Sequence, residues 1–164
     1  MPAPASPAAP RARARRPRKA RLRLHLQVVS REVRVPTSAQ IRRWARVALE
    51  SSAEITVRIV GAAEARILNR RYCRRDHATN VLSFSYALSR GLVQGDIVLC
   101  APVIAREALA QGKTVEAHFA HLTVHGVLHL QGHRHAGPRE AARMEALEKN
   151  LLVKLGYPDP YDAG

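Results

Sequence analysis

The sequence predicts an α+β domain in which helices pack on one four-stranded mixed sheet. Residues 22–28 alternate apolar Leu and Val with Arg, His and Gln, and Ile55, Val57 and Ile59 repeat the alternation. A period of two is typical of a strand with one buried face. Residues 81–86 and 96–100 have the length and apolar content of two more strands. Because helical segments separate these strands, we expect a single sheet covered by helices.

The domain should begin near residue 22, after a basic tail. Residues 1–21 are rich in Pro, Ala and Arg and bury too little apolar surface to fold, which predicts a disordered tail before a single domain over 22–164. The tail is either solvated without a specific role or a non-specific RNA tether. A transit peptide is disfavoured because serine is nearly absent. The basic residues up to position 25 are Arg11, Arg13, Arg15, Arg16, Arg18, Lys19, Arg21 and Arg23.

Five helices are expected between and after the strands. Thr37 and Gln40 have the spacing of a capping box, and Pro102 suits the first turn of a helix that ends near Gly112. Gly156 suits the C-terminal cap of the last helix. The predicted helices begin at Thr37 and near 62, 102, 115 and 138.

The charge balance indicates a polyanionic partner. The chain has 27 Lys and Arg against 13 Asp and Glu, a formal net charge of +14. Nucleic acid is the first candidate, and an anionic membrane surface the second. No run approaches the roughly 18 apolar residues of a membrane span, and no apolar stretch resembles a signal peptide, so a cytoplasmic protein without a membrane partner is expected. Cys73 and Cys100 are expected to be unpaired thiols.

Histidines cluster in one short segment of the chain. His125 and His129 lie four residues apart on the helix predicted over 115–130, so their rings project from one face. Gly132 then permits the backbone to reverse, and His135 can supply a third ligand. Three imidazoles are typical of catalytic zinc sites, which keep a fourth position open. We therefore predict one zinc ion on His125, His129 and His135, at a central helix and the following loop.

The histidine spacing can be compared with that of known zinc proteases. The spacing equals that of the metzincin proteases, H-E-x-x-H-x-x-G-x-x-H, but Gly126 occupies the position of the glutamate that serves as general base. This difference disfavours a metalloprotease. His133 is an alternative third ligand, and His118 and His121 are expected in supporting or core roles.

Three segments together resemble the YbeY family of bacterial rRNA maturation factors. Residues 118–135 are similar to its signature H-G-x-L-H-L-x-G-[HYW]-D-H. Residues 69–84 resemble N-x-x-Y-R-x-x-D-x-x-T-[ND]-V-L-S-F, and residues 95–99 resemble G-D-I-x-[IL]. The likeness covers about residues 50–160. It implies a zinc-dependent single-strand endoribonuclease that matures the 3′ end of small-subunit rRNA, acts in ribosome quality control and associates with the ribosomal small subunit.

The chain departs from this family pattern at two positions. Cys73 replaces the arginine that follows the tyrosine, and Arg134 replaces an aspartate. Both changes, and the absence of an evident general base, favour an alternative: a non-catalytic, zinc-containing RNA-binding assembly factor.

An arginine-rich segment is the predicted RNA contact. Arg74 or Arg71 is expected to neutralise charge that develops on the phosphate during cleavage. Arg70, Arg75 and Arg134 are expected to bind RNA phosphates, although a solvated helix end would have the same composition. We expect Asp76, Thr79 and Asn80 to build the turn into the next strand.

Overall fold

The computed structural model describes residues 19–86 and 91–162 and contains one four-stranded sheet. The strands are β1 (Leu22–Val28), β2 (Ser52–Val60), β3 (Val81–Ser85) and β4 (Leu92–Cys100), in the order β1-β2-β4-β3. β1, β2 and β4 are mutually parallel, and β3 pairs antiparallel with β4 at the edge. The predicted α+β class and mixed sheet are confirmed. Residues 1–18 of the predicted tail lie outside the described residues.

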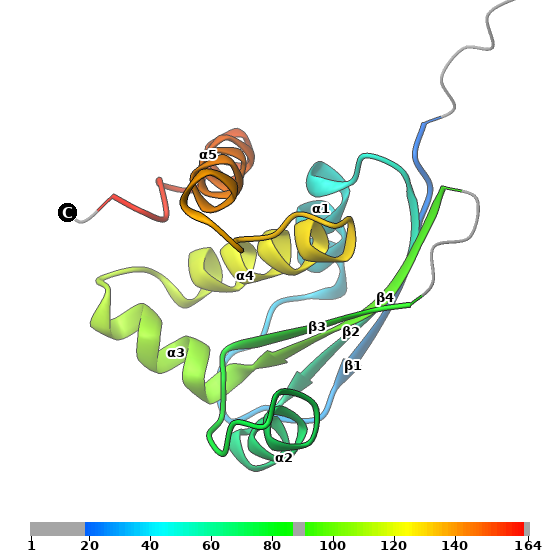
Figure 1. Ribbon diagram of the computed structural model, residues 1–164. Helices are drawn as coiled ribbons and strands as arrows, with labels where there is room; N and C mark the ends of the chain where they lie inside the picture. The colour runs from blue at the N-terminus through cyan, green and yellow to red at the C-terminus, as the bar shows by residue number, and fades with distance from the viewer. Residues whose placement is uncertain (1–18, 87–90, 163–164) are drawn as a thin grey trace, which may run out of the picture.

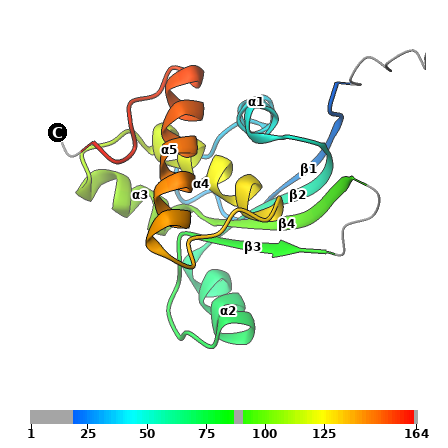
Figure 2. The ribbon, with the colours of Figure 1, turned by 45° about the horizontal axis from the view of Figure 1, so that its top comes forward.

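The helices cover the two sheet faces unequally. They are α1 (Ser38–Ala48), α2 (Ala62–Cys73), α3 (Ala101–Ala110), α4 (Val115–Leu130) and α5 (Pro138–Leu155). Figure 1 shows α1, α4 and α5 on one side of the sheet and α2 on the other, and Figure 2 shows α5 crossing over α4. The α2 side and the α4 side of the sheet are therefore differently covered surfaces.

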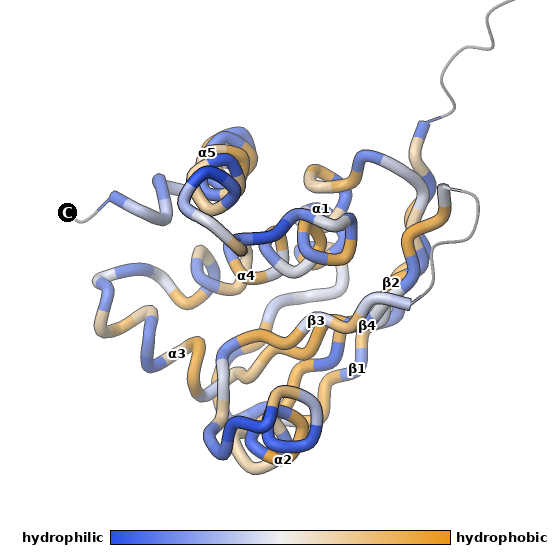
Figure 3. The backbone as a smooth tube through the Cα atoms, in the orientation of Figure 1, coloured by the Kyte–Doolittle hydropathy of each residue, from blue (hydrophilic) through white to orange (hydrophobic). Residues whose placement is uncertain are grey.

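The main core lies between the sheet and α4. Buried residues of β2 and β4 pack against α4 and α1, and Trp44 and Phe119 are among the largest fully buried side chains. Figure 3 accordingly shows many hydrophobic residues, in orange, along the strands of the sheet. Helix α4 is buried over most of its length because it lies between the sheet, α1 and α5. Its partly exposed positions are few, and His121, His125 and His129 are among them.

The β4 strand is longer than the sequence predicts. It begins at Leu92 rather than Asp96, and its first half pairs with β2 from Ser52 onward. Gly95 obscures this half because glycine is a poor strand former. A Cβ atom at Gly95 would lie 2.5 Å from the Phe84 carbonyl oxygen and 2.5 Å from a methyl carbon of Leu130. Only glycine therefore allows β3 and the end of α4 to approach β4 this closely.

None of the helices in the described ranges, 19–86 and 91–162, is both long enough and apolar enough to cross a lipid bilayer.

Candidate metal centre

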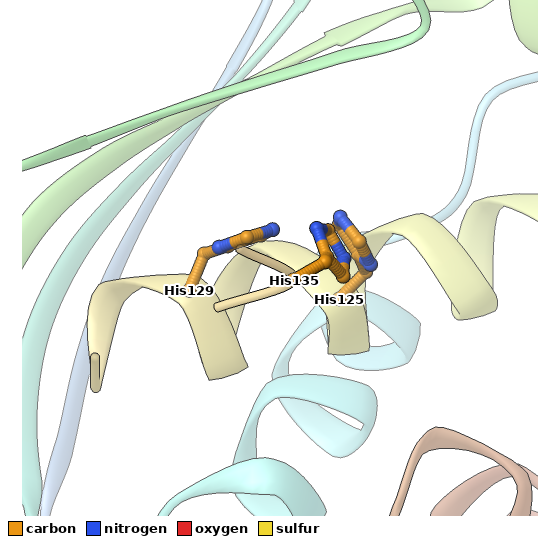
Figure 4. Close-up of side chains that lie close together, drawn as sticks. All are labelled: His125, His129 and His135. Carbon is orange, nitrogen blue, oxygen red and sulfur yellow. The ribbon is translucent and has the colours of Figure 1, made fainter. Parts of the chain in front are cut away.

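Three imidazole rings converge where α4 ends. His125 and His129 lie one turn apart on α4, and His135 returns from the following loop, as Figure 4 shows. One ring nitrogen from each residue lies within 4.8 Å of the others. The ring centroids are 4.5 Å apart for His125 and His129, 4.9 Å for His125 and His135, and 4.6 Å for His129 and His135. This spacing suits three ligands of one small cation.

The turn that returns His135 depends on Gly132. Its φ of +95° lies in the region that favours glycine, and the His133 N–H donates to the Leu128 carbonyl at 3.1 Å. This bond, together with Gly132 N–H to the His129 carbonyl at 3.0 Å, ends the helix as a glycine cap does. The chain then folds back over the face that carries His125 and His129.

A buried glutamate on α5 holds the first of these rings. Oε1 of Glu148 accepts a hydrogen bond from Nδ1 of His125 at 2.5 Å, and Oε2 accepts one from Nε2 of His121 at 2.9 Å. The Tyr161 hydroxyl also donates to Glu148. Because Nδ1 of His125 is engaged, Nε2 is the nitrogen left for a metal. Such carboxylate-to-histidine contacts fix ring orientation in metal sites.

Electrostatics keep these groups in the required protonation states. Burial and the neighbouring rings of His125 and His135 lower the pKa of His129 to about 4, so its imidazole is neutral at neutral pH. Burial alone would raise the pKa of Glu148, but hydrogen bonds from His121 and His125 outweigh it and lower that pKa to about 2. Burial and the Glu148 carboxylate raise the pKa of Tyr161, which stays a donor. Metals require such neutral imidazoles.

The three rings open into a cavity of about 520 Å³. Besides the histidines, its wall includes Cys73 from the end of α2, Ser83 and Ser85 from β3, and Arg134 from the loop. None of the described residues that line it carries a carboxylate. The donor set is therefore imidazole nitrogen, and the surroundings add hydroxyl, thiol and guanidinium groups.

Close packing explains the glycine at position 126. A Cβ atom there would lie 3.0 Å from two side-chain atoms of Ile97 on β4. The position faces the sheet, and both residues are buried. A glutamate in this place would press into the apolar core. The packing against β4 therefore excludes the general base of the metzincin motif.

The remaining predicted site residues lie in several places. Nε2 of His133 lies 3.1 Å from Glu50, so this ring turns toward α1 although it borders the cavity. His118 is buried and contacts Glu107 at 2.7 Å, and burial lowers its pKa. His121, with its contact to Glu148, has the supporting position expected of it.

The arginines of the α2 end are exposed beside the cavity. Arg70, Arg71, Arg74 and Arg75 flank Cys73 in the sequence, but only Cys73 of this segment lines the cavity. Arg74 caps α2 in the left-handed conformation at φ 56°. Of the predicted RNA contacts, Arg134 borders the cavity itself. Asp76 forms a two-point ion pair with Arg66, at 2.8 and 2.9 Å, instead of a local turn bond. Asn80 accepts from the Val81 N–H at 2.7 Å at the start of β3.

Sequence reasoning missed Glu148 and Tyr161. The signal for Glu148 was present, since Met144, Glu148 and Leu152 recur at four-residue spacing and all three are buried. A carboxylate in an apolar stripe of a helix requires a buried partner. No periodic pattern marks Tyr161 in the sequence, because it lies in the irregular segment after α5.

Comparison with known proteins places these features in a family. The family model described as endoribonuclease YbeY matches residues 27–156, beginning upstream of the likeness seen in the motifs. The endoribonuclease YbeY of Aromatoleum aromaticum is 62% identical over 128 residues, covering 78% of this chain and 82% of that protein. The Methylobacillus flagellatus protein of the same name is 49% identical over 143 residues, covering 87% and 95%.

A solved structure has a related fold. The solution structure of TM1509 from Thermotoga maritima matches with a TM-score of 0.52 at 18% identity and covers 86% of this chain and 99% of that one.

Proposed function

The chain belongs to the YbeY endoribonuclease family, and from this premise we propose that it cleaves single-stranded RNA with one zinc ion bound by His125, His129 and His135. The observation that carries the proposal is the convergence of three imidazoles in an open cavity without a carboxylate. Imidazole nitrogen ligands suit zinc. The exposed arginines at the end of α2 suit a phosphodiester substrate.

The chain's own residues would prepare the site for this reaction. Glu148 holds the proton on Nδ1 of His125, and burial keeps His129 neutral, so ligand nitrogens are available. Zinc, when bound, supplies a Lewis acid for a phosphoryl oxygen and for water. Arg74 or Arg71 would neutralise charge developing on the phosphate. Arg70, Arg75 and Arg134 would hold neighbouring phosphates.

The described cavity wall contains no carboxylate base, so the attacking oxygen must be activated without one. It belongs either to water or to the RNA 2′-hydroxyl. Products that end in a 3′-hydroxyl indicate water, whereas 2′,3′-cyclic phosphates indicate the 2′-hydroxyl. End analysis of the cleaved RNA therefore assigns the nucleophile.

Membership of the family supports a proposal for the biological substrate. We propose the 3′ end of small-subunit rRNA as the substrate, with roles in maturation and ribosome quality control and the ribosomal small subunit as partner. The direct test is cleavage of end-labelled single-stranded RNA by the full-length protein. Cleavage should stop with chelator or His125→Ala and persist with His25→Ala, an exposed histidine on β1.

A second function has specific support. Cys73 and Arg134 border the cavity at positions where the family pattern has arginine and aspartate. They favour an assembly factor that binds RNA and zinc without cutting. Zinc-loaded wild-type protein that binds rRNA but leaves it intact would support this alternative and contradict the nuclease proposal.

A further inference from the structure

A second groove lies on the opposite side of the sheet from α4, on the side that α2 covers in the described part of the chain (Figure 1). It has a volume of about 430 Å³ and runs between α2 and the strands. Tyr72 from α2, and Phe84 and Tyr86 from β3 and the residue after it, line its wall. Tyr72 is 56% exposed and Tyr86 is 53% exposed. Exposed aromatic rings gathered in one groove indicate a surface that contacts another molecule.

The rings are held in place by polar and aromatic contacts. Tyr72 packs edge-on against Phe84 with ring centroids 5.0 Å apart, and the Arg71 guanidinium lies 5.5 Å from the centre of the Tyr72 ring. The hydroxyl of Tyr86 donates to Asp96. These contacts orient the rings in advance, while half of each tyrosine remains open.

The charges of the groove favour a polyanion at the α2 end. Its two carboxylates are engaged, since Glu64 pairs with Arg58 at 2.7 Å and Asp96 accepts from Tyr86. By contrast, no ion pair within the described ranges involves the four arginines at the end of α2: Arg70, Arg71, Arg74 and Arg75. The aromatic surface therefore adjoins a cluster of exposed guanidinium groups.

The groove and the metal centre share two elements. β3 is an edge strand, and its last three residues alternate: Ser83 and Ser85 line the metal cavity, whereas Phe84 lines the groove. At the end of α2, Tyr72 lines the groove and Cys73 lines the metal cavity. A flexible polymer bound in the groove can pass over this edge and present its next segment to the histidines.

We propose that this groove binds bases of single-stranded RNA by stacking on Tyr72 and Tyr86, upstream or downstream of the bond at the metal centre. The inference rests on the proposed function for its ligand. Stacking on aromatic side chains is tolerant of sequence and requires unpaired bases, since the bases of a duplex already stack on each other. The groove would thus explain selection of single strands.

The test measures affinity for a labelled single-stranded RNA by fluorescence anisotropy. All proteins are full-length and carry His125→Ala, so that the RNA stays intact. Tyr72→Leu and Tyr86→Leu should each weaken binding by about fivefold or more, as loss of one stacked base does. Tyr72→Phe and Tyr86→Phe should bind like the parent because the ring remains. Leu109→Ala, at a residue 84% exposed on α3, is the control and should have no effect.

Salt dependence separates stacking from charge. The leucine variants should keep the slope of log affinity against log salt concentration. Arg70→Gln with Arg71→Gln should reduce that slope by up to about 1.4, the value for two single-strand phosphates.

Three results would overturn the inference. One is unchanged RNA affinity in both leucine variants. If these variants instead lost binding to a protein partner, the groove would be a protein-binding surface and the inference would be wrong. The others are equal losses in the phenylalanine variants and equal losses for duplex RNA. Binding in the His125→Ala background is independent of cleavage. The proposal of RNA cleavage can therefore fail while the proposal of base stacking in the groove stands, and the stacking proposal can fail while the cleavage proposal stands.

Discussion

Oε1 of the buried Glu148 lies 2.5 Å from Nδ1 of His125, so a carboxylate on α5 fixes a proposed metal ligand on α4. Glu148→Gln removes the charge and one acceptor oxygen while keeping the shape of the side chain. We expect zinc affinity to fall by about 10- to 100-fold, as is typical when such a partner is lost. Competition with a chromophoric chelator measures the change.

The matched control is Glu145→Gln, at an exposed glutamate on the same helix. It should retain the parent affinity. Equal zinc affinity in Glu148→Gln and the parent would show that Glu148 stabilises the fold without orienting the ligand.

The neutral state of His129 predicts how stability depends on pH. The unfolded chain binds a proton at this residue below about pH 6.5, whereas the folded chain binds it only below about pH 4. Between these values the unfolded state holds more protons, so acidification favours unfolding. The unfolding free energy of the metal-free protein should fall between pH 6.5 and 4, by about 3 kcal/mol from this residue.

Urea unfolding across this range, compared with His129→Gln, isolates the contribution. The variant should show a shallower dependence on pH. An identical dependence in both proteins would contradict the assignment of the lowered pKa to His129.

The contact between Gly126 and Ile97 predicts that a protease base cannot be restored. Gly126→Glu places a carboxylate against the apolar surface of β4, where a Cβ alone would already lie 3.0 Å from Ile97. Crowding and an unpaired buried charge should lower the unfolding free energy by at least about 3 kcal/mol. Gly137→Glu, where a Cβ meets nothing within 4 Å, is the control for urea unfolding. A stable Gly126→Glu variant that hydrolyses peptides would refute this explanation.

A side chain at position 95 should also destabilise the fold, but for a different reason. In Gly95→Ala the methyl group meets the Phe84 carbonyl, which belongs to the paired backbone of β3 and cannot rotate away. We expect a loss of about 2 kcal/mol or more in unfolding free energy. Gly137→Ala, which only replaces the N-cap residue of α5, should cost less than about 1 kcal/mol. A Gly95→Ala protein within 0.5 kcal/mol of the parent would mean that β3 can shift on β4.

Local periodicity explains why much of the site was predictable. His125 and His129 share a helix face because four residues make about one turn, and Gly132 marks the reversal that returns His135. Glu148 was not predicted, because its contact with His125 joins two helices and depends on how α5 crosses α4. Likewise, Gly95 weakens the strand signal in the sequence of the first half of β4. This half forms a strand because it pairs with β2.

Zinc content per chain tests the central claim most directly. Elemental analysis of the purified full-length protein should find one zinc ion per chain in the parent and in His133→Ala, whose ring faces Glu50. His135→Ala should lose the ion, because two imidazoles remain where three converge. Stoichiometric zinc in His135→Ala, or its loss in His133→Ala instead, would contradict the proposed ligand set.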